Sequence, residues 1–355
     1  MPETDSASER LAPIRLGLCG LGYGIKQGRI LLQRPFADSI WIVAVCDQIP
    51  ERLSRGIAEF KCKGYASLES LLEDNEIEAV GLFSSPAGRA ELIMKIIRAG
   101  KHVMTTKPFE LDPAAALEVL YEARRRKCLI HLNSPSSVLG RDLAIVQEWQ
   151  ARYALGEIIF AQSDCWYRAL ETPDGSWYDD PELCPVAPIC RLGIYGINDI
   201  LALMKEPVEL QVLESRMRTL RPTPDVAQVS VRFANGAMAV VRATWCCGPI
   251  RNNQVSEYVF ERGVIRRSYE IGGVWESDTV LTLDAIDRDD RAVRDEAKVS
   301  QHLTNSAYRW DLFHLGIRRG GLVAEVAPEA VVAGVRFMVE VARASRGGGT
   351  WRRVG

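Results

Sequence analysis

Short apolar runs alternate with amphipathic segments along the first third of the chain. Runs of this kind predict buried strands, and they lie at Ile14–Cys19, Trp41–Cys46, Ala79–Phe83, His102–Thr105 and Leu129–Leu132. The intervening segments have helical spacing and typical helix starts, such as the expected N-caps Ser67 and Asp112. Apolar strands separated by helices are typical of a parallel sheet covered on both faces, so this part of the chain predicts an α/β fold.

The pattern changes near residue 156, where apolar and polar residues begin to alternate. Alternation of period two predicts strands with one buried face, at Leu210–Met217, Val226–Phe233, Ala237–Thr244 and Glu257–Glu261. Asn235-Gly236 lies between two of these strands and is typical of a tight hairpin, because both residues tolerate positive φ. Helical segments follow near Ser306–Arg319 and Pro328–Ser345. We therefore expect a large, mostly antiparallel sheet in the second part of the chain.

The composition narrows the classes of protein. The chain has 355 residues, of which 47% are hydrophobic and 25% charged, and its formal net charge is -2. This length favours two domains. The balanced charge gives no footprint for nucleic acid, and no apolar run approaches the roughly 18 residues of a membrane span. Residues 1–13 are polar and lack the apolar core of a signal peptide, so we expect a disordered lead-in to a cytoplasmic protein without nucleic-acid or membrane partners.

Cysteine and histidine usage limits the available chemistry. The nine cysteines include no C-x-x-C pair, and several lie in apolar runs, where cysteine packs as a small hydrophobe. We therefore expect no metal site. The chain has only four histidines, so any acid–base chemistry must come from few histidines or from other groups.

A glycine-rich turn follows the first predicted strand and begins the first helix. Gly20 and Gly22 occupy the first two positions of a G-x-G-x-x-G pattern, and Ile25 stands in the third position with Gly24 just before it. The first glycine allows a tight turn, and the second lets a pyrophosphate approach the helix N-terminus. The turn predicts a dinucleotide site that includes Gly20, Gly22, Tyr23, Gly24 and Ile25.

Asp47 strengthens this prediction. It lies 25 residues after Gly22, at the end of the second strand, where a carboxylate can bond the hydroxyls of the adenosine ribose. A carboxylate would repel a 2′-phosphate, so Asp47 favours NAD over NADP. Arg52 and Arg55 weaken that preference if they fold back over the site, and NADP is not excluded.

Several motifs together resemble the glucose-fructose oxidoreductase/inositol dehydrogenase (Gfo/Idh/MocA) family. In chain order they are Gly17–Gly24, Val45–Asp47, Ser84–Pro86, Gly100–Val103, Thr106–Pro108, Gly156–Ile158, Gly193–Asn198 and Phe233–Gly236. The resemblance implies an N-terminal Rossmann domain and a C-terminal α/β domain with a large open sheet. It also implies oxidation or reduction of sugars, polyols or related compounds with NAD(P), by a homodimer or homotetramer joined through that sheet. On this basis we expect the Rossmann domain at residues 14–135 and the substrate and oligomerisation domain at residues 136–355.

The family's Glu-Lys-Pro motif corresponds here to Thr106-Lys107-Pro108. The resemblance makes Lys107 a candidate for catalysis and for cofactor contact, together with Ser85, Pro86 and Pro108. Lys107 follows a buried strand, at the edge of the sheet where ligands bind. An ammonium group there can bond the substrate oxygen and assist proton transfer.

The family's second catalytic stretch corresponds to residues 191–195. Tyr195 occupies the position that a catalytic histidine has in many relatives. In this respect the chain resembles the branch of the family in which a tyrosine is the expected acid or base. Arg191 replaces a common acidic residue, and a guanidinium there can bind a carboxylate or phosphate of an anionic substrate. The other substrate-binding candidates are Arg168, Trp177 and Asn198.

These observations predict an NAD(P)-dependent dehydrogenase or reductase acting on a CH–OH group of a sugar-like compound. Lys107 and Tyr195 would supply proton transfer and substrate orientation. The departures at Thr106 and Arg191 leave a second interpretation open, a dinucleotide-binding regulator or sensor with degraded chemistry on the same fold. A purely structural partner subunit is a third, weaker interpretation.

Overall fold

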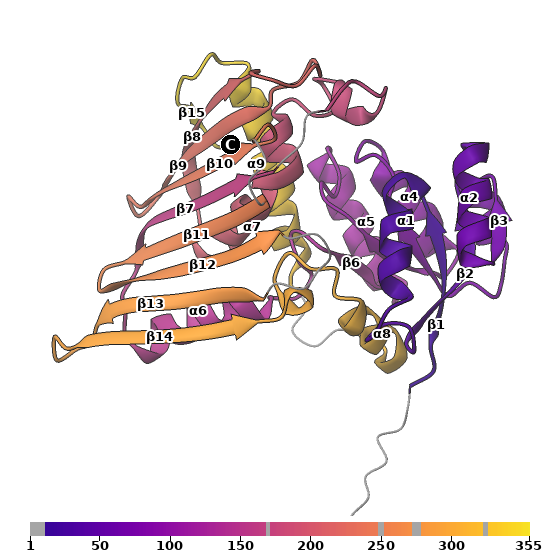
Figure 1. The fold of residues 1–355 in the computed structure, drawn as a ribbon, viewed down its shortest axis with the longest axis horizontal. Coiled ribbons are helices and arrows are strands. Elements are labelled where there is room, and N and C mark those ends of the chain that lie inside the picture. Colours follow the sequence, from indigo (N-terminus) through magenta and orange to yellow (C-terminus); the bar gives the residue numbers. More distant parts are fainter. Residues whose placement is uncertain (1–10, 168–170, 248–251, 272–277, 322–325) are drawn as a thin grey trace, which may run out of the picture.

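The chain folds into two sheets that lie side by side in the computed structural model (Figure 1). The structure describes residues 11–167, 171–247, 252–271, 278–321 and 326–355. A six-stranded sheet has the order β3-β2-β1-β4-β5-β6, and a nine-stranded sheet has the order β14-β13-β12-β11-β7-β10-β9-β8-β15. This arrangement confirms the predicted fold class of a parallel nucleotide-binding sheet followed by a larger, mostly antiparallel one.

The six-stranded sheet is parallel throughout. Its strands are β1 (Ile14–Cys19), β2 (Ile40–Cys46), β3 (Lys63–Tyr65), β4 (Ala79–Leu82), β5 (His102–Thr105) and β6 (Ile130–Leu132). Its helices are α1 (Leu21–Leu31), α2 (Pro50–Phe60), α3 (Leu68–Leu72), α4 (Arg89–Arg98) and α5 (Pro113–Arg125). The strand order reverses between β1 and β4, and ligands bind in the crevice beyond the strand ends at such a point.

Two apolar cores cover the two faces of this sheet. Ala116 and Val119 of α5 belong to one core, and Leu21 and Leu31 of α1 belong to the other. Two later helices join them, since α8 (Trp310–Arg319) buries Trp310 beside α1, and α9 (Pro328–Ser345) starts against the α5 side. A division of the chain at residue 135 therefore omits C-terminal segments that complete the Rossmann core. No helix in the described ranges is long and apolar enough to cross a bilayer.

The nine-stranded sheet is antiparallel except where β7 and β10 pair in parallel at its centre. Its strands are β7 (Ile158–Trp166), β8 (Pro207–Ser215), β9 (Val226–Phe233), β10 (Met238–Thr244), β11 (Asn252–Phe260), β12 (Gly263–Ile271), β13 (Thr279–Ile286), β14 (Ala292–Val299) and β15 (Arg352–Arg353). The predicted hairpin is confirmed, because Gly236 adopts φ +87° in the turn between β9 and β10. Gly can adopt this conformation without steric penalty.

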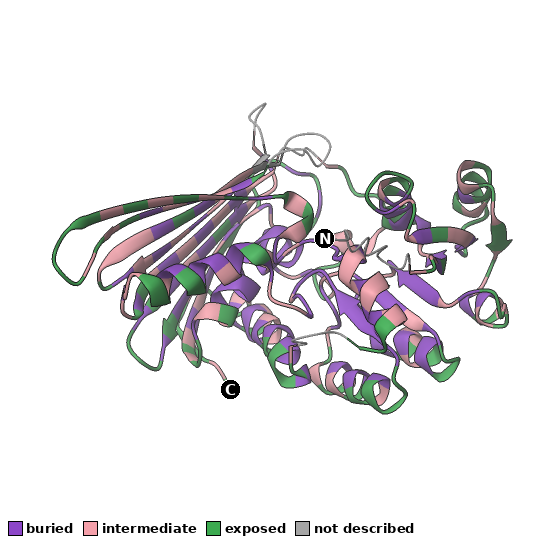
Figure 2. Cartoon of the chain, turned by 90° about the horizontal axis from the view of Figure 1, so that it is seen from below, coloured by how far each residue is buried: buried purple, intermediate pink, exposed green. Residues whose placement is uncertain are grey.

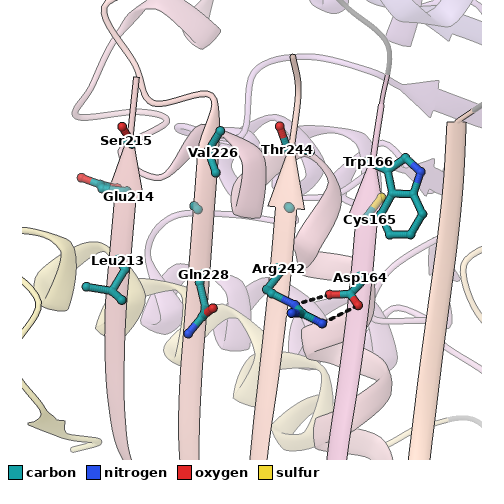
Figure 3. A pocket seen from close by; sticks show the side chains of 12 residues that line it. Asp164, Cys165, Trp166, Leu213, Glu214, Ser215, Val226, Gln228, Arg242 and Thr244 are labelled. Atoms are coloured by element: carbon teal, nitrogen blue, oxygen red, sulfur yellow. Dashed lines mark hydrogen bonds and ion pairs between the residues drawn. The ribbon is translucent and has the colours of Figure 1, made fainter. Parts of the chain in front are cut away.

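Helices cover only one face of the larger sheet (Figures 1 and 2). These are α6 (Arg141–Arg152), α7 (Ile194–Leu203) and α9, and the apolar side chains of the sheet's inner face pack against them. The opposite face of β8, β9, β10 and β7 carries a shallow groove of about 540 Å³, crossed by the Arg242–Asp164 ion pair at 2.6 Å (Figure 3). Exposed Leu213 also lines this groove.

A buried ion triad fixes α7 to the sheet. Arg267 on β12 lies 2.7 Å from Asp199 on α7 and 3.0 Å from Asp142 on α6, and all three residues are at least 98% buried. Asn305 joins the two carboxylates, because its backbone N–H donates to Asp142 and its amide donates to Asp199, both at 2.8 Å. The helix that carries Tyr195 is therefore tied to the sheet by charge as well as by apolar packing.

Candidate functional site

The glycine turn at the end of β1 has the conformation that a dinucleotide site requires. Gly20 is the N-cap of α1 with φ +87°, and a Cβ at this position would lie 2.8 Å from the carbonyl group of Phe83. Only glycine satisfies both constraints. The first turn of α1 contains no acidic residue and Gly20 provides no side-chain cap, so the helix N-terminus can still bind an anion beside the Leu21 N–H that Asp47 occupies. This geometry fits a pyrophosphate.

Asp47 closes the same turn from β2. One carboxylate oxygen accepts a hydrogen bond from Leu21 N at 2.7 Å, and the other accepts from Ile49 N at 2.9 Å. The residue is 8% exposed and therefore braces the start of α1. The exposed Arg52 folds back toward the turn, since a Cβ on Gly22 would lie 3.4 Å from its Nη1 atom. A cation thus accompanies the carboxylate at the position where the adenosine ribose is expected.

One arginine joins the loops that follow β4 and β5. Arg89 is 1% exposed, and its guanidinium donates to the carbonyl oxygens of Ser84, Thr106, Pro108 and Phe109. Burial lowers the pKa of Arg89 to about 10, so it remains charged at neutral pH. The predicted cofactor residues Ser85 and Pro86 and the predicted catalytic Lys107 are therefore held on connected loops.

Ser85 provides an independent test of cofactor fit. Its hydroxyl oxygen is buried and has no hydrogen-bond partner among the described residues. A buried polar atom without a partner is costly unless a ligand or water satisfies it. Ser85 lies beyond the end of β4, beside the switch point, so a bound dinucleotide can supply the missing partner.

Asn133 brings Lys107 and Tyr195 together. Its Oδ1 atom accepts a hydrogen bond from the backbone N–H of Lys107 at 3.0 Å, and its Nδ2 atom donates to the hydroxyl of Tyr195 at 3.1 Å. Because a backbone N–H can only donate, the orientation of the amide is fixed. The Lys107 ammonium lies 5.0 Å from the centre of the Tyr195 ring and donates to the carbonyl oxygen of Arg191. The peptide between Lys107 and Pro108 is cis.

The two candidate catalytic groups are shifted in opposite directions. Burial, assisted by the charge of Arg191, lowers the pKa of Lys107 to about 8. Burial is also the main reason that the pKa of Tyr195 rises well above 10, although the hydrogen bond from Asn133 acts the other way. The nearby lysine would favour the phenolate, but desolvation outweighs that effect. Lys107 is therefore the group that exchanges a proton near neutral pH, and Tyr195 remains a phenol.

The guanidinium of Arg191 already binds a carboxylate of the protein. Its two terminal nitrogens donate to the carboxylate of Glu171 at 2.6 and 2.9 Å, and its guanidinium lies between the rings of Tyr178 and Trp245, 3.8 and 3.5 Å from their centres. Burial would raise the pKa of Glu171, but the bonds from Arg191 and Arg221 hold it below its usual value. This corrects the expectation that Arg191 offers a free guanidinium to an anionic substrate.

The remaining predicted substrate residues do not gather around Lys107. Trp177 packs against Tyr178, with ring centres 4.2 Å apart, beside the small core of Cys184, Ala187 and Cys190. Asn198 is 4% exposed and donates to the hydroxyl of Ser134 at 2.8 Å, so its amide joins α7 to the loop after β6 and does not face the substrate as expected. Arg168 lies outside the described residues.

The sequence interpretation missed four residues of the site: Asn133, Arg89, Glu171 and Tyr308. Asn133 follows strand β6 as Lys107 follows β5, so the same rule of strand ends would have identified it. Tyr308 explains the threonine in place of the motif glutamate, because its hydroxyl lies 2.6 Å from Thr106 Oγ1. The pairs formed by Arg89 and Glu171 depend on tertiary contacts that no local pattern signals.

All nine cysteines are free thiols. Six of them are buried and three are partly exposed. In the part of the chain that the structure describes, no group of three or more histidine, cysteine, aspartate or glutamate side chains is arranged to hold a metal ion.

Two family profiles match the chain. Residues 14–134 match the "Oxidoreductase family, NAD-binding Rossmann fold", and residues 144–266 match the "GFO/IDH/MocA C-terminal domain". The chain belongs to the GFO/IDH/MocA oxidoreductase family. This confirms the resemblance drawn from the motifs and the nucleotide-binding role of the N-terminal sheet.

Some of the curated relatives are named for reactions on sugars. The chain is 30% identical over 121 residues to dTDP-3,4-didehydro-2,6-dideoxy-alpha-D-glucose 3-reductase of Saccharopolyspora spinosa, a match covering 34% of this chain and 36% of that protein. It is 27% identical over 237 residues to galactose 1-dehydrogenase of Pseudomonas fluorescens, covering 66% of this chain and 70% of that protein. The first of these matches thus spans about a third of the relative's length.

Solved structures of the same fold carry either nicotinamide cofactor. Levoglucosan dehydrogenase in complex with NADH and L-sorbose superposes with a TM-score of 0.75 at 16% identity, over 97% of this chain and 100% of that one. A 3-ketoreductase from Actinomadura kijaniata in complex with TDP-benzene and NADP superposes with a TM-score of 0.71 at 18% identity, over 95% of this chain and 98% of that one. At these identities the likeness establishes the fold.

Proposed function

We propose that this protein is an NAD(P)-dependent oxidoreductase that interconverts an alcohol and a carbonyl group on an uncharged, sugar-like substrate. The observation that carries the proposal is the Asn133 bridge, which holds Lys107 and Tyr195 together at the strand ends beside the dinucleotide turn. The family and the sugar-acting relatives support the reaction class.

The nicotinamide supplies hydride acceptance and donation when it is bound. Tyr195 accepts a hydrogen bond from Asn133, so its own hydroxyl proton points elsewhere and can hydrogen-bond the substrate oxygen without being transferred. Lys107, with a pKa of about 8, takes the hydroxyl proton when the alcohol is oxidised and returns a proton when the carbonyl is reduced. Gly20, Gly22 and the first turn of α1 would hold the pyrophosphate.

The site favours an uncharged substrate because its nearby arginines are already paired. Glu171 neutralises Arg191, while Arg221 is bound by Glu171, Asp174 and Asp179. An anionic substrate would have to displace a carboxylate that already makes two charge-assisted bonds to Arg191.

Glu171→Gln should therefore shift specificity toward anions. The variant keeps the size of the side chain but removes its charge and one of the two oxygens that accept from Arg191, so Arg191 loses its counter-charge. We expect the ratio of kcat/KM for a uronate to that for the matching neutral sugar to rise about tenfold, the value of roughly one charge-assisted interaction. Steady-state kinetics on such a pair measures this ratio.

Asp174→Asn is the matched control. Asp174 pairs with Arg221 and not with Arg191, so its loss should leave the ratio unchanged. Equal ratios in the wild type and in Glu171→Gln would show that Arg191 lies outside the substrate's reach.

Arg52 should decide how well NADP is accepted. Its guanidinium lies beside Gly22 and makes no hydrogen bond or ion pair within the described ranges, so it is available to a 2′-phosphate. We expect Arg52→Ala to weaken NADPH binding about tenfold and to change NADH binding little, as measured by quenching of protein fluorescence. Arg55→Ala, one turn away on α2, provides the control. A parallel loss for both nucleotides would contradict this role.

The protein is proposed to form a homodimer or homotetramer through the open face of the larger sheet. Within the described part of the chain that face has no helical cover, and it displays exposed apolar side chains, with Leu213 in the groove of Figure 3 and Met238 on the same face of β10 as Arg242. Leu213→Asp should lower the mass measured by light scattering if this face is the interface. An unchanged mass would place the contact elsewhere or leave the chain monomeric.

A titration followed by a substrate screen tests the function as a whole. NADH and NADPH are titrated first, and neutral sugars and polyols are then screened for change in absorbance at the nicotinamide band. Binding with turnover that falls in Tyr195→Phe supports the enzyme. Binding without turnover of any substrate would favour the regulator interpretation, to which the departures at Thr106 and Arg191 already point. Failure to bind either nucleotide would overturn both.

A further inference from the structure

A second cavity lies behind the helix that carries Tyr195. Its volume is about 220 Å³, and its walls come from the loop at 108–111, the segment at 182–194 and helix α9. Cys190, Ile194 and Asn198 face it at every fourth position of η2 (Ile189–Gly193) and α7, whereas Arg191 and Tyr195 occupy the neighbouring stripe. The cavity is therefore distinct from the catalytic crevice. It is larger than the roughly 150 Å³ that accommodates benzene in an engineered protein core.

The cavity walls are largely apolar, and their polar members are the buried amide of Asn198 and the charged side chains of Glu110, Glu182, Arg343 and Arg346. Leu183, Ile194, Val335 and Met338 are among its lining residues. Asn198 is 4% exposed, and its Nδ2 atom donates to Ser134 while its Oδ1 atom has no hydrogen-bond partner in the described part of the chain. Because the Ser134 hydroxyl can donate or accept, reversing the amide would still leave one of its ends unpaired. An unpaired buried polar atom in an apolar wall provides a specific point of attachment for a ligand.

Charge at the cavity is balanced. Arg346 pairs with Glu182, Arg343 pairs with Glu340 at 2.6 Å, and both oxygens of Glu110 accept backbone N–H bonds at 2.7 Å. The ionic groups around the cavity are thus occupied by one another. This arrangement favours an uncharged ligand.

The cavity also adjoins the bond that holds the catalytic ammonium. Pro108 and Cys190 both line it, and these residues are the chain neighbours of Lys107 and Arg191, whose carbonyl oxygen accepts from the Lys107 ammonium. A molecule in the cavity contacts both sides of that interaction. Its occupancy can therefore change the position of the ammonium without entering the crevice.

We propose that this cavity is a second small-molecule site, which binds a compact uncharged compound with an aromatic or branched apolar body and one hydroxyl or amide group bonded to Asn198. Its occupancy modulates the catalytic site through Lys107, and only this second part rests on the proposed function.

Phenol and toluene are the matched probes, because they differ by the one polar group. Isothermal titration of the full chain, without nucleotide or sugar, should show saturable binding of phenol at one site. The ratio of phenol affinity to toluene affinity should fall about tenfold in Asn198→Leu, which keeps the side-chain shape and removes the polar atoms. An unchanged ratio would overturn the assignment of Asn198.

A second pair of variants keeps the test decisive if Asn198→Leu does not fold. Ala342→Trp fills the cavity from α9 and should abolish phenol binding, whereas Ala333→Trp on an exposed position of the same helix should not. A crystal soaked in phenol that shows only water in the cavity would overturn the site. Binding that persists in Ala342→Trp would do so as well.

Steady-state kinetics test the modulation of the catalytic site separately from the binding of phenol. With an active substrate, saturating phenol should change kcat/KM at least threefold in the wild type and leave it unchanged in Ala342→Trp. Saturable phenol binding without any such change would overturn the modulation alone. Because binding is measured without nucleotide or sugar, a failure of the proposed reaction does not affect that measurement.

Discussion

Replacing Lys107 with alanine should lower kcat/KM by roughly a hundred- to ten-thousand-fold, the usual range for loss of a general acid–base group. The physical reason is that Lys107 is the one candidate in the Lys107–Asn133–Tyr195 unit whose proton exchanges near neutral pH. Its pKa is about 8, whereas the pKa of the Tyr195 phenol lies well above 10. Steady-state kinetics in both directions, with NADH affinity measured separately, distinguishes loss of chemistry from loss of cofactor.

The role of Lys107 also predicts the direction in which kcat/KM changes with pH. Reduction requires the protonated ammonium, so kcat/KM for the carbonyl substrate should be constant below pH 8 and fall about tenfold per unit above it. Oxidation requires the neutral amine, so its kcat/KM should rise up to pH 8 and then level. The pH-dependent part of each profile should disappear in Lys107→Ala. Profiles that keep the limb near pH 8 in the variant would assign the proton to another group.

Replacing Arg267 with methionine should destabilise the protein by about 3–5 kcal/mol, because it leaves two buried carboxylates without a counter-charge. Burial already raises the pKa of Asp142 even with Arg267 in place. Chemical denaturation followed by tryptophan fluorescence measures the loss. Since Asp199 and Tyr195 lie one turn apart on α7, the folded variant should also lose activity.

Arg266→Met is the matched control for this prediction. Arg266 precedes Arg267 on the same strand, but its side chain is 56% exposed and pairs with Glu257 at 3.5 Å, so we expect a change below about 1 kcal/mol. The deficit of Arg267→Met should shrink at acidic pH. Without the arginine the folded pKa of Asp142 lies still further above its unfolded value, so protonation as pH falls through that folded pKa relieves the destabilisation. Equal stability of the two variants would show that the triad contributes no net energy.

Local sequence patterns correctly predicted the fully buried strands and the tight hairpin turn. The five apolar runs of the first domain and the Asn235-Gly236 turn are confirmed, because buried parallel strands and two-residue hairpins impose strong local constraints. The short strand β3 and the exposed helix α2 were not predicted. Helix α2 was missed although Leu53, Ile57 and Phe60 recur at helical spacing, and its burial is slight, with Gly56 its one fully buried residue.

The second domain shows why alternation can mislead. Strand β12 contains Arg266 and Arg267, and two adjacent charges suggest a solvated segment, yet Arg267 is almost wholly buried. Its burial depends on Asp142 and Asp199, which lie far away in the chain. Only the tertiary fold brings those charges together.

Some features of the candidate site could likewise be predicted from the sequence, and others could not. The glycine turn, Asp47 and Lys107 could be located from the strand ends, since the topology places all strand ends at one edge. The state of Arg191 could not, because the Glu171 carboxylate that occupies it lies in an irregular segment. Burial energies likewise decide that Tyr195 keeps its proton, and a sequence does not reveal burial at that level.

The contacts of Arg89 bear on how this enzyme can change by evolution or engineering. One guanidinium binds carbonyl groups from the loop after β4 and from the loop after β5. A shift in either backbone therefore disturbs bonds to the other. Grafting one of these loops from a relative should fail where grafting both with their arginine succeeds, so mutations that retune the cofactor side and the catalytic side will be epistatic.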